Sequence, residues 1–344
     1  MAQTTTERPK VIDGSPEILE RPTDAVRGTL AVLVIAVGSI FLIVTLWQNL
    51  FTVGPAFEEM IDGFRPVLAD EALDQAATDV GGLGAVAEEF QTDLFPALSQ
   101  ALGLSGEELQ GFIGDQFPAV ATGVAALPEI STTFDGLVST LGEQQDLFNS
   151  ADEIPTKDLS ATSIPWFLAI AGILVIGAGL LMLRRGSLGS TSALGLGAAL
   201  IAAVLILSLI PKASDADQLN ENLFPIYTAQ LVSDAQGALQ TVGAMGEEMQ
   251  TAMLPALAEQ LQMQPEEVNA FLGQFPATAA TLETLPVTME RFDGLVATFD
   301  HNLDNYETIE PVAFSPIIWM VAIGGAVVML LGGAALLADR RRVL

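Results

Sequence analysis

Acidic side chains recur at matching positions in two distant parts of this 344-residue chain. Glu88 and Glu89 lie in the segment AVAEEFQTDLFPAL, and Glu247 and Glu248 lie in the related segment AMGEEMQTAMLPAL. Carboxylates that both copies retain either bind a cation or partner, or serve the fold that the copies share. These four glutamates are therefore candidate positions for an interaction or for a structural role in the repeat.

A second pair of carboxylates is Asp135 and Asp293, in the related segments PEISTTFDGLVST (128–140) and PVTMERFDGLVAT (286–298). Each follows a phenylalanine and precedes a glycine. A carboxylate in this setting caps a backbone bend with a hydrogen bond, lies on the surface, or faces a groove between the copies. If one carboxylate set is functional, we expect it to be Asp135 and Asp293. The structural role is the favoured one, and the alternative is that the two carboxylates share a divalent cation.

Signatures of metal binding and catalysis are otherwise poor. The chain has no cysteine and one histidine, His301, so it offers neither a thiol nucleophile nor a zinc site built from several Cys or His ligands. The Asp215-x-Asp217 pair does not extend into a calcium loop of regularly spaced oxygen ligands. A G-x-G-x-x-A match at 82–87 has no preceding strand. We therefore predict no cofactor and no enzymatic activity.

Four apolar segments flank the two polar regions and predict transmembrane helices. They lack charged side chains and are long enough to cross a hydrocarbon core, which takes about 20 residues. The segments are 29–53, 164–183, 188–210 and 317–338. The duplicated part is therefore a span, a polar domain and a second span.

Basic residues predict the orientation, because lysine and arginine are retained on the cytoplasmic side. Most of the 13 basic residues flank the spans in three short segments: Arg8, Lys10, Arg21, Arg27, Arg184, Arg185, Arg340, Arg341 and Arg342. We expect a multi-pass plasma-membrane protein with both termini in the cytoplasm and with 54–163 and 211–316 outside. Trp47, Trp166 and Trp319 fall near the outer span ends, where tryptophan anchors a helix at the interface.

Apolar periodicity predicts that both outer regions are helical. Phe90, Leu94 and Leu98 recur every fourth residue, as on one face of an amphipathic helix. Ser105-x-x-Glu108 has the form of a capping box, and in the matching place Pro265 begins a first turn before Glu266 and Glu267. Phe-Pro pairs at 117–118 and 275–276 separate helices, and Pro96 and Pro255 should kink or break them.

The predicted fold is therefore all-α, with two repeated helical bundles related by a pseudo-twofold axis along the membrane normal and facing each other across it. Small residues at Thr191, Gly195, Ala199 and Ala203, and at Gly324 and Gly332, predict close packing between spans. The expected parts are a tail (1–28), spans (29–53, 164–183, 188–210, 317–338), acidic domains (54–163, 211–316), a cytoplasmic loop (184–187) and a tail (339–344).

The net charge of −29 lies mainly on the two outer domains. Such domains repel nucleic acid and accumulate cations. We expect the lipid bilayer as one partner, a protein partner or a second copy of the chain as another, and no nucleic acid. The acidity itself is compatible with cation binding or with solubility alone.

The paired L/F-P-A-L, F-P and F-D-G-L-V segments, with four spans and acidic outer domains, are similar to uncharacterised membrane proteins of high-GC Gram-positive, actinobacterial-type bacteria. The resemblance extends from the first span onward, and it implies no catalytic residue and no established function. Our leading hypothesis is a non-enzymatic cell-envelope protein whose outer domains bind a partner protein or envelope component.

Two alternatives remain: a passive pore or transport component along the pseudo-twofold axis, and an extracytoplasmic ligand sensor that lacks its own output domain. A pore needs polar residues along several spans, and these spans carry only isolated polar side chains. Because the spans carry no ionisable side chain, a proton-coupled pump is disfavoured.

Overall fold

The computed structural model describes residues 22–156, 159–223 and 227–340, and these residues form helices and loops without a strand. The elements are α1 (Pro22–Trp47), α2 (Leu50–Phe64), α3 (Asp70–Glu89), η1 (Phe90–Leu94), α4 (Phe95–Leu102), α5 (Gly106–Gln116), α6 (Pro118–Asp152), α7 (Ser163–Ile206), α8 (Leu209–Leu223), α9 (Ala229–Glu248), η2 (Met249–Met253), α10 (Leu254–Gln260), α11 (Pro265–Leu272), α12 (Pro276–His301), α13 (Leu303–Ile309) and α14 (Phe314–Arg340). The predicted all-α class is confirmed for this part of the chain. The basic tail residues Arg8, Lys10, Arg21, Arg341 and Arg342 lie outside the described residues.

The chain divides into two compact units, which we describe separately. The span unit comprises 1–42, 170–202 and 322–344. The bundle unit comprises 43–169 and 203–321.

Three described helices are long and apolar enough to cross a membrane: α1 over Ala25–Trp47, α7 over Ser163–Ile206 and α14 over Phe314–Asp339. Helix α7 has 44 residues, but its backbone leaves helical geometry at Arg185 (φ −130°, ψ 30°) and Gly186 (φ 32°, ψ −97°). These two residues therefore divide α7 into two helical segments.

Glycines bring the helices of the span unit close together. A Cβ atom added to Gly38 of α1 would lie 2.7 Å from the carbonyl oxygen of Gly172 in α7. One added to Gly197 would lie 2.5 Å from the carbonyl oxygen of Gly325 in α14. Only glycine permits such backbone approach, so these positions carry the interhelical contacts.

The small-residue stripe predicted in the second half of α7 is not the face that contacts α14. Thr191, Gly195 and Ala199 are exposed, whereas Ala193 and Gly197 are buried. Ala193 and Gly197 are four residues apart, as are the members of the predicted stripe, so spacing alone could not identify the face that meets α14. The predicted packing role of Gly324 and Gly332 is supported, because both are buried against neighbouring helices.

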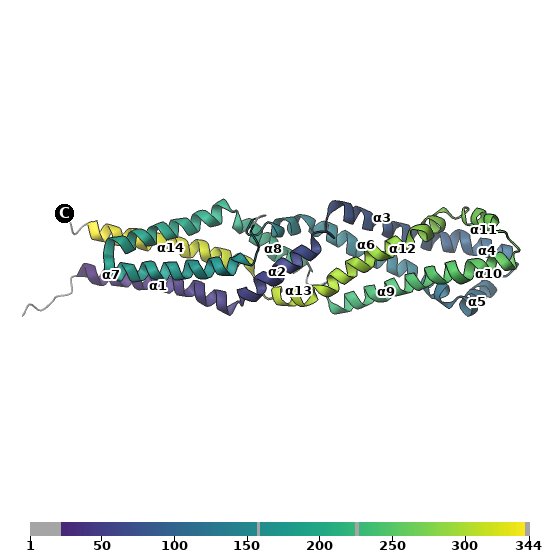
Figure 1. The fold of residues 1–344 in the computed structure, drawn as a ribbon, viewed down its shortest axis with the longest axis horizontal. Coiled ribbons are helices and arrows are strands. Elements are labelled where there is room, and N and C mark those ends of the chain that lie inside the picture. Colours follow the sequence, from purple (N-terminus) through teal and green to yellow (C-terminus); the bar gives the residue numbers. More distant parts are fainter. Residues whose placement is uncertain (1–21, 157–158, 224–226, 341–344) are drawn as a thin grey trace, which may run out of the picture. The chain divides into compact units, whose positions relative to one another are not determined.

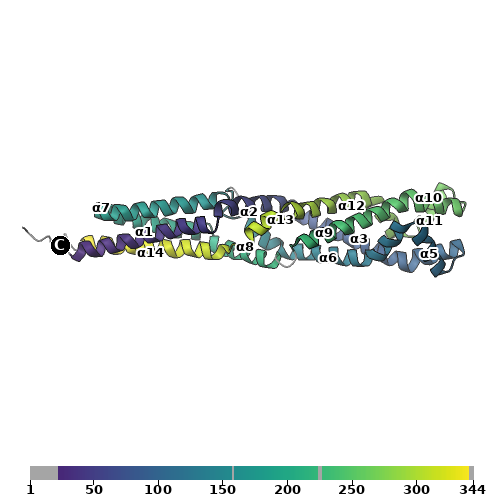
Figure 2. The same ribbon diagram turned by 90° about the horizontal axis from the view of Figure 1, so that it is seen from below.

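Four long helices form the core of the bundle unit. Helix α3 packs against α6 and α12, and α9 packs against the same two helices (Figure 1). Helix α2 pairs with α13, and α8 packs against α6 (Figure 2). We call α2–α6 the first copy and α8–α13 the second copy.

The two copies therefore interleave, and the predicted division into separate bundles at 54–163 and 211–316 is not confirmed. Both ranges belong to one compact unit, in which α6 meets α9 and α3 meets α12 across the copies. The physical reason is that a repeated sequence gives each helix a matching apolar face in its own copy and in the other copy. Periodicity marks that face but does not select the helix that covers it.

The order of elements repeats along the two copies. Helix α3 begins at Asp70 and α9 at the matching Ala229, and each is followed by a π-helical segment and a short helix. Left-handed residues also match: Asn49 (φ 49°) corresponds to Ser208 (φ 51°). Because these residues interrupt the helix, α1 ends at Trp47 and α7 at Ile206, earlier than the predicted span ends at 53 and 210.

The prolines at positions 96 and 255 do not break the chain's helical course. Each lies just after a five-residue π-helical segment, η1 or η2. A proline lacks the amide hydrogen and clashes with the carbonyl four residues earlier. A wider turn before the proline accommodates this defect, so the helical backbone is not broken at either proline.

Candidate functional site

Two of the repeated glutamates tie the copies together at the ends of α3 and α9. Glu89 accepts hydrogen bonds from the backbone amides of Ala277 (3.2 Å) and Thr278 (2.7 Å) in the first turn of α12. Glu248 accepts one from the amide of Val120 (2.8 Å) in the first turn of α6. Each carboxylate therefore caps a helix of the other copy, and we call this pair the distal caps.

The Phe-Pro pairs explain why a distant carboxylate is needed. The first amides of a helix have no partner within the helix. The residues before α6 and α12 are Phe117 and Phe275, and neither side chain makes a capping hydrogen bond. The distal caps supply the missing acceptor, and their negative charge also suits the positive end of the helix dipole.

The other repeated carboxylates lie at the surface. Glu88 and Glu247 are exposed, next to the capping residues. Asp135 and Asp293 are exposed within the continuous helices α6 and α12, so neither ends a backbone bend. Among the described residues, no group of three or more His, Cys, Asp or Glu side chains is arranged to hold a metal ion.

The structure shows a further pair of capping carboxylates, Glu58 and Asp217, that the sequence analysis did not identify. Glu58 of α2 accepts a hydrogen bond from the amide of Ala161 (2.6 Å), just before α7. Asp217 of α8 accepts hydrogen bonds from the amides of Phe314 (2.6 Å) and Ser315 (2.9 Å) at the start of α14. These proximal caps occupy matching repeat positions, and extending the repeat comparison back to α2 and α8 would have revealed them.

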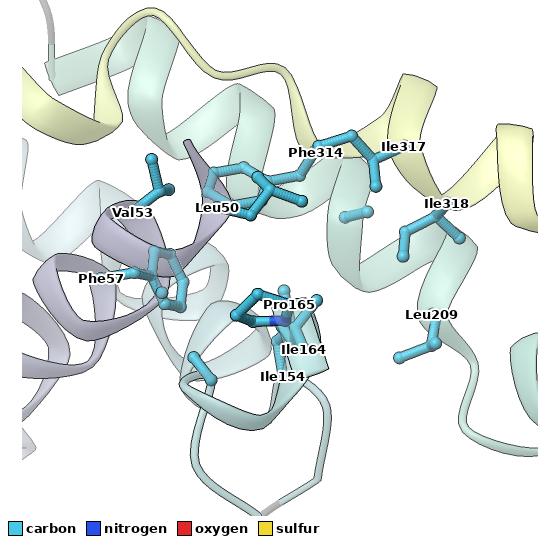
Figure 3. A pocket seen from close by; sticks show the side chains of 13 residues that line it. Leu50, Val53, Phe57, Ile154, Ile164, Pro165, Leu209, Phe314, Ile317 and Ile318 are labelled. Carbon is cyan, nitrogen blue, oxygen red and sulfur yellow. The ribbon is translucent and has the colours of Figure 1, made fainter. Parts of the chain in front are cut away.

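The proximal caps border an apolar chamber, which is our candidate functional site. Side chains of α2, α8 and the first turns of α7 and α14 converge on a common space (Figure 3). The chamber has two adjoining lobes with cavity volumes of about 40 and about 190 Å³. Residues that line both lobes are Ile154, Ile164, Leu209, Ile317 and Ile318.

Both copies contribute to the chamber at matching positions. Leu50 and Gly54 of α2 correspond to Leu209 and Ala213 of α8, and all four line the smaller lobe. A Cβ atom added to Gly54 would lie 3.2 Å from the carbonyl oxygen of Ala161. Glycine therefore allows α2 to approach the chain that enters α7.

Exposed apolar side chains surround the larger lobe. Leu159 and Phe167 line it and are 53% and 50% exposed. The predicted interface anchors are exposed too, with Trp47 at 85%, Trp166 at 62% and Trp319 at 50%. Trp166 packs edge-on against Phe51, with ring centroids 5.1 Å apart. Large exposed apolar side chains of this kind indicate a lipid or protein environment.

No protein-family model matches this chain, and no curated protein matches it. The chamber itself offers little acid–base chemistry, because its lining is apolar and the bordering carboxylates accept hydrogen bonds from backbone amides. It is suited to holding an apolar group rather than to transforming a substrate.

The capping role predicts that replacing Glu89 destabilises the protein much more than replacing the adjacent Glu88. Glu89→Ala removes two charge-assisted hydrogen bonds to α12 and should lower the free energy of unfolding by about 2 kcal/mol. Glu88→Ala removes the same charge from an exposed position and should change it by no more than about 0.5 kcal/mol. Thermal and denaturant unfolding of the purified full-length variants measures both. Equal destabilisation by the two changes would contradict the capping role.

Proposed function

We propose that the chain is a non-enzymatic, four-span membrane protein of the cell envelope, whose extracytoplasmic bundle unit binds an envelope component through the apolar chamber. That component is the acyl chain of a bilayer lipid. The observation that carries the proposal is a chamber lined by apolar side chains from both copies, at the first turns of two helices able to cross a membrane.

Contacts within the span unit support the four-span topology. Arg27 near the start of α1 lies 3.9 Å from Asp339 near the end of α14. A Cβ atom on Gly186, at the interruption of α7, would lie 3.0 Å from the Arg27 guanidinium and 3.5 Å from the Asp339 carboxylate. These contacts support a topology in which the start of α1, the 184–187 loop and the end of α14 lie on one side of the membrane, and the arginines of these segments favour the cytoplasm.

The chemistry of the larger lobe favours an acyl chain over a polar ligand. Leu168 and Val204 from the two halves of α7 and Val321 of α14 form its walls, and all three lie in segments apolar enough to span a membrane. A polar molecule would find few hydrogen-bonding partners there, and burying it would cost free energy. An acyl chain needs no hydrogen-bonding partner there, and the apolar lining replaces the contacts that it made in the bilayer.

The interior of the span unit favours an anchor over a pore. Val34 and Phe41 of α1, Met182 of α7 and Val328 of α14 are fully buried. These side chains fill the space between helices that already approach each other at glycines. A passive path along the pseudo-twofold axis would have to displace them.

The topology predicts which engineered cysteines react from outside the cell. The natural chain has no cysteine, so a single replacement reports alone. Ser139→Cys and Thr298→Cys should react with a membrane-impermeant maleimide in intact cells, and Ser187→Cys should react only after permeabilisation. Labelling of the Ser187 variant in intact cells, with protection of both outer sites, would overturn the topology.

The chamber predicts selective labelling by a phospholipid with a photoreactive acyl chain. In nanodiscs of the full-length protein, adducts mapped by mass spectrometry should concentrate on chamber residues. Ala203→Leu places a larger side chain in the larger lobe and should remove most of these adducts.

The matched control is Ala202→Leu, which makes the same change at an exposed neighbouring position and should retain the adducts. Thermal unfolding checks that both variants remain folded. Labelling spread evenly over the spans, or adducts equal in the two variants, would contradict the proposal.

A further inference from the structure

A second cavity breaks the symmetry between the copies. Phe134 and Phe292 occupy matching positions and pack edge-on, with ring centroids 5.0 Å apart. One cavity near this pair lies among α3, α6 and α12, and we call it the Asp79 cavity. A matching cavity lies among α9, α6 and α12. Neither shares a lining residue with the apolar chamber.

The two cavities differ strongly in size. The Asp79 cavity has a volume of about 340 Å³, whereas its counterpart has about 20 Å³. Ala72 lines the larger cavity where Leu231 lines the smaller, and Leu141 of the larger corresponds to Phe299 of the smaller. Phe299 also packs against Tyr227, with ring centroids 5.0 Å apart. Larger side chains thus fill one of the two matching cavities, and smaller side chains leave the other open.

The open side also carries an ion pair that the filled side lacks. Asp79 and Arg291 line the Asp79 cavity, and alanine and threonine occupy their matching positions, 238 and 133. The Asp79 side chain is only 7% exposed, and its Oδ2 lies 2.8 Å from Arg291 Nη2. Its Oδ1 accepts hydrogen bonds from Gln75 Nε2 and Arg291 Nη2, both at 3.0 Å.

The Oδ2 atom of Asp79 is the exceptional group here. It is buried and accepts no hydrogen bond from the described residues, despite its ion pair with Arg291. A buried acceptor without a hydrogen bond costs free energy. Arg291 Nη2 already donates to Oδ1, and it approaches Oδ2 without the geometry of a hydrogen bond. An adjoining cavity provides room for a ligand that donates to this oxygen.

We propose that the Asp79 cavity binds a small organic cation, an amine with a compact apolar body. Its ammonium group donates to Asp79 Oδ2, and the body packs against Leu73, Val138 and Leu295. Two carboxylates, those of Asp79 and Glu290, line the cavity against one guanidinium, so a cation is favoured over an anion.

Two further features suit a cationic ligand. Arg291 is 41% exposed, so its guanidinium can turn toward solvent and release the Asp79 carboxylate. The net charge of −29 also raises the local concentration of cations around the protein. The volume lies in the range of about 300–1,000 Å³ that is typical of small-molecule sites.

The test uses three probes of one shape: 2-phenylethylamine, 2-phenylethanol and phenylacetate. Calorimetric titration of the full-length protein in nanodiscs, with empty nanodiscs as the blank, should give the amine a dissociation constant at least roughly tenfold below those of the alcohol and the acid. Asp79→Asn should abolish this preference. This ranking in the wild-type protein needs no variant, so it tests the proposal even if a variant misfolds.

Filling the cavity provides the matched structural test. Ala72→Leu installs the side chain that the filled cavity already holds, and it should abolish amine binding. Ala77→Leu makes the same change on the exposed face of α3 and should leave amine binding unchanged. Equal binding of the three probes, no amine binding at millimolar concentration, or unchanged binding in a folded Ala72→Leu variant would overturn the proposal.

Discussion

The capping of one copy's helix by the other copy's carboxylate is the interaction on which the bundle unit depends. Helices α6 and α12 begin after phenylalanine, which cannot accept a hydrogen bond from their first amides. Glu89 and Glu248 meet this need from across the unit. Because the chain has no cysteine, such polar contacts and apolar packing hold the interleaved copies together without disulfides.

The proximal caps apply the same principle where α7 and α14 begin. Glu58 and Asp217 fix the backbone just before each helix, and the chamber lies between the segments that they hold. The geometry of the chamber is therefore coupled to charge-assisted hydrogen bonds at its border. A bound acyl chain would stabilise this arrangement of the segments, since it adds contacts without demanding new polar partners.

Local signals in the sequence were sufficient for much of the helical structure. The capping box at Ser105 and Glu108 is present, with hydrogen bonds of 2.8 and 3.3 Å, and Pro265 begins α11. The interleaving of the copies was not predictable, because intra-copy and cross-copy packing bury the same apolar faces. The distal caps were not predictable for a related reason: Glu89 and Glu88 look alike in the sequence, and only the fold shows which one reaches α12. The proximal caps that border the chamber, Glu58 and Asp217, could have been found by extending the repeat comparison.

Duplication also leaves an internal reference within the chain. Where both copies keep a residue type, as at the distal caps, the role is shared by the fold. Where one side departs, as at Asp79 and Arg291, the shared fold does not require the change, so a separate reason is needed. Comparison of matching positions thus distinguishes residues that stabilise the bundle in both copies from residues with a role in one copy only.

Amide hydrogen exchange in single-cap variants tests the interleaved account most directly. Glu248→Ala, a change in the second copy, should speed exchange at Val120 in the first copy. Glu89→Ala, a change in the first copy, should speed exchange at Ala277 and Thr278 in the second copy. Faster exchange confined to the copy that carries the substitution would contradict the account.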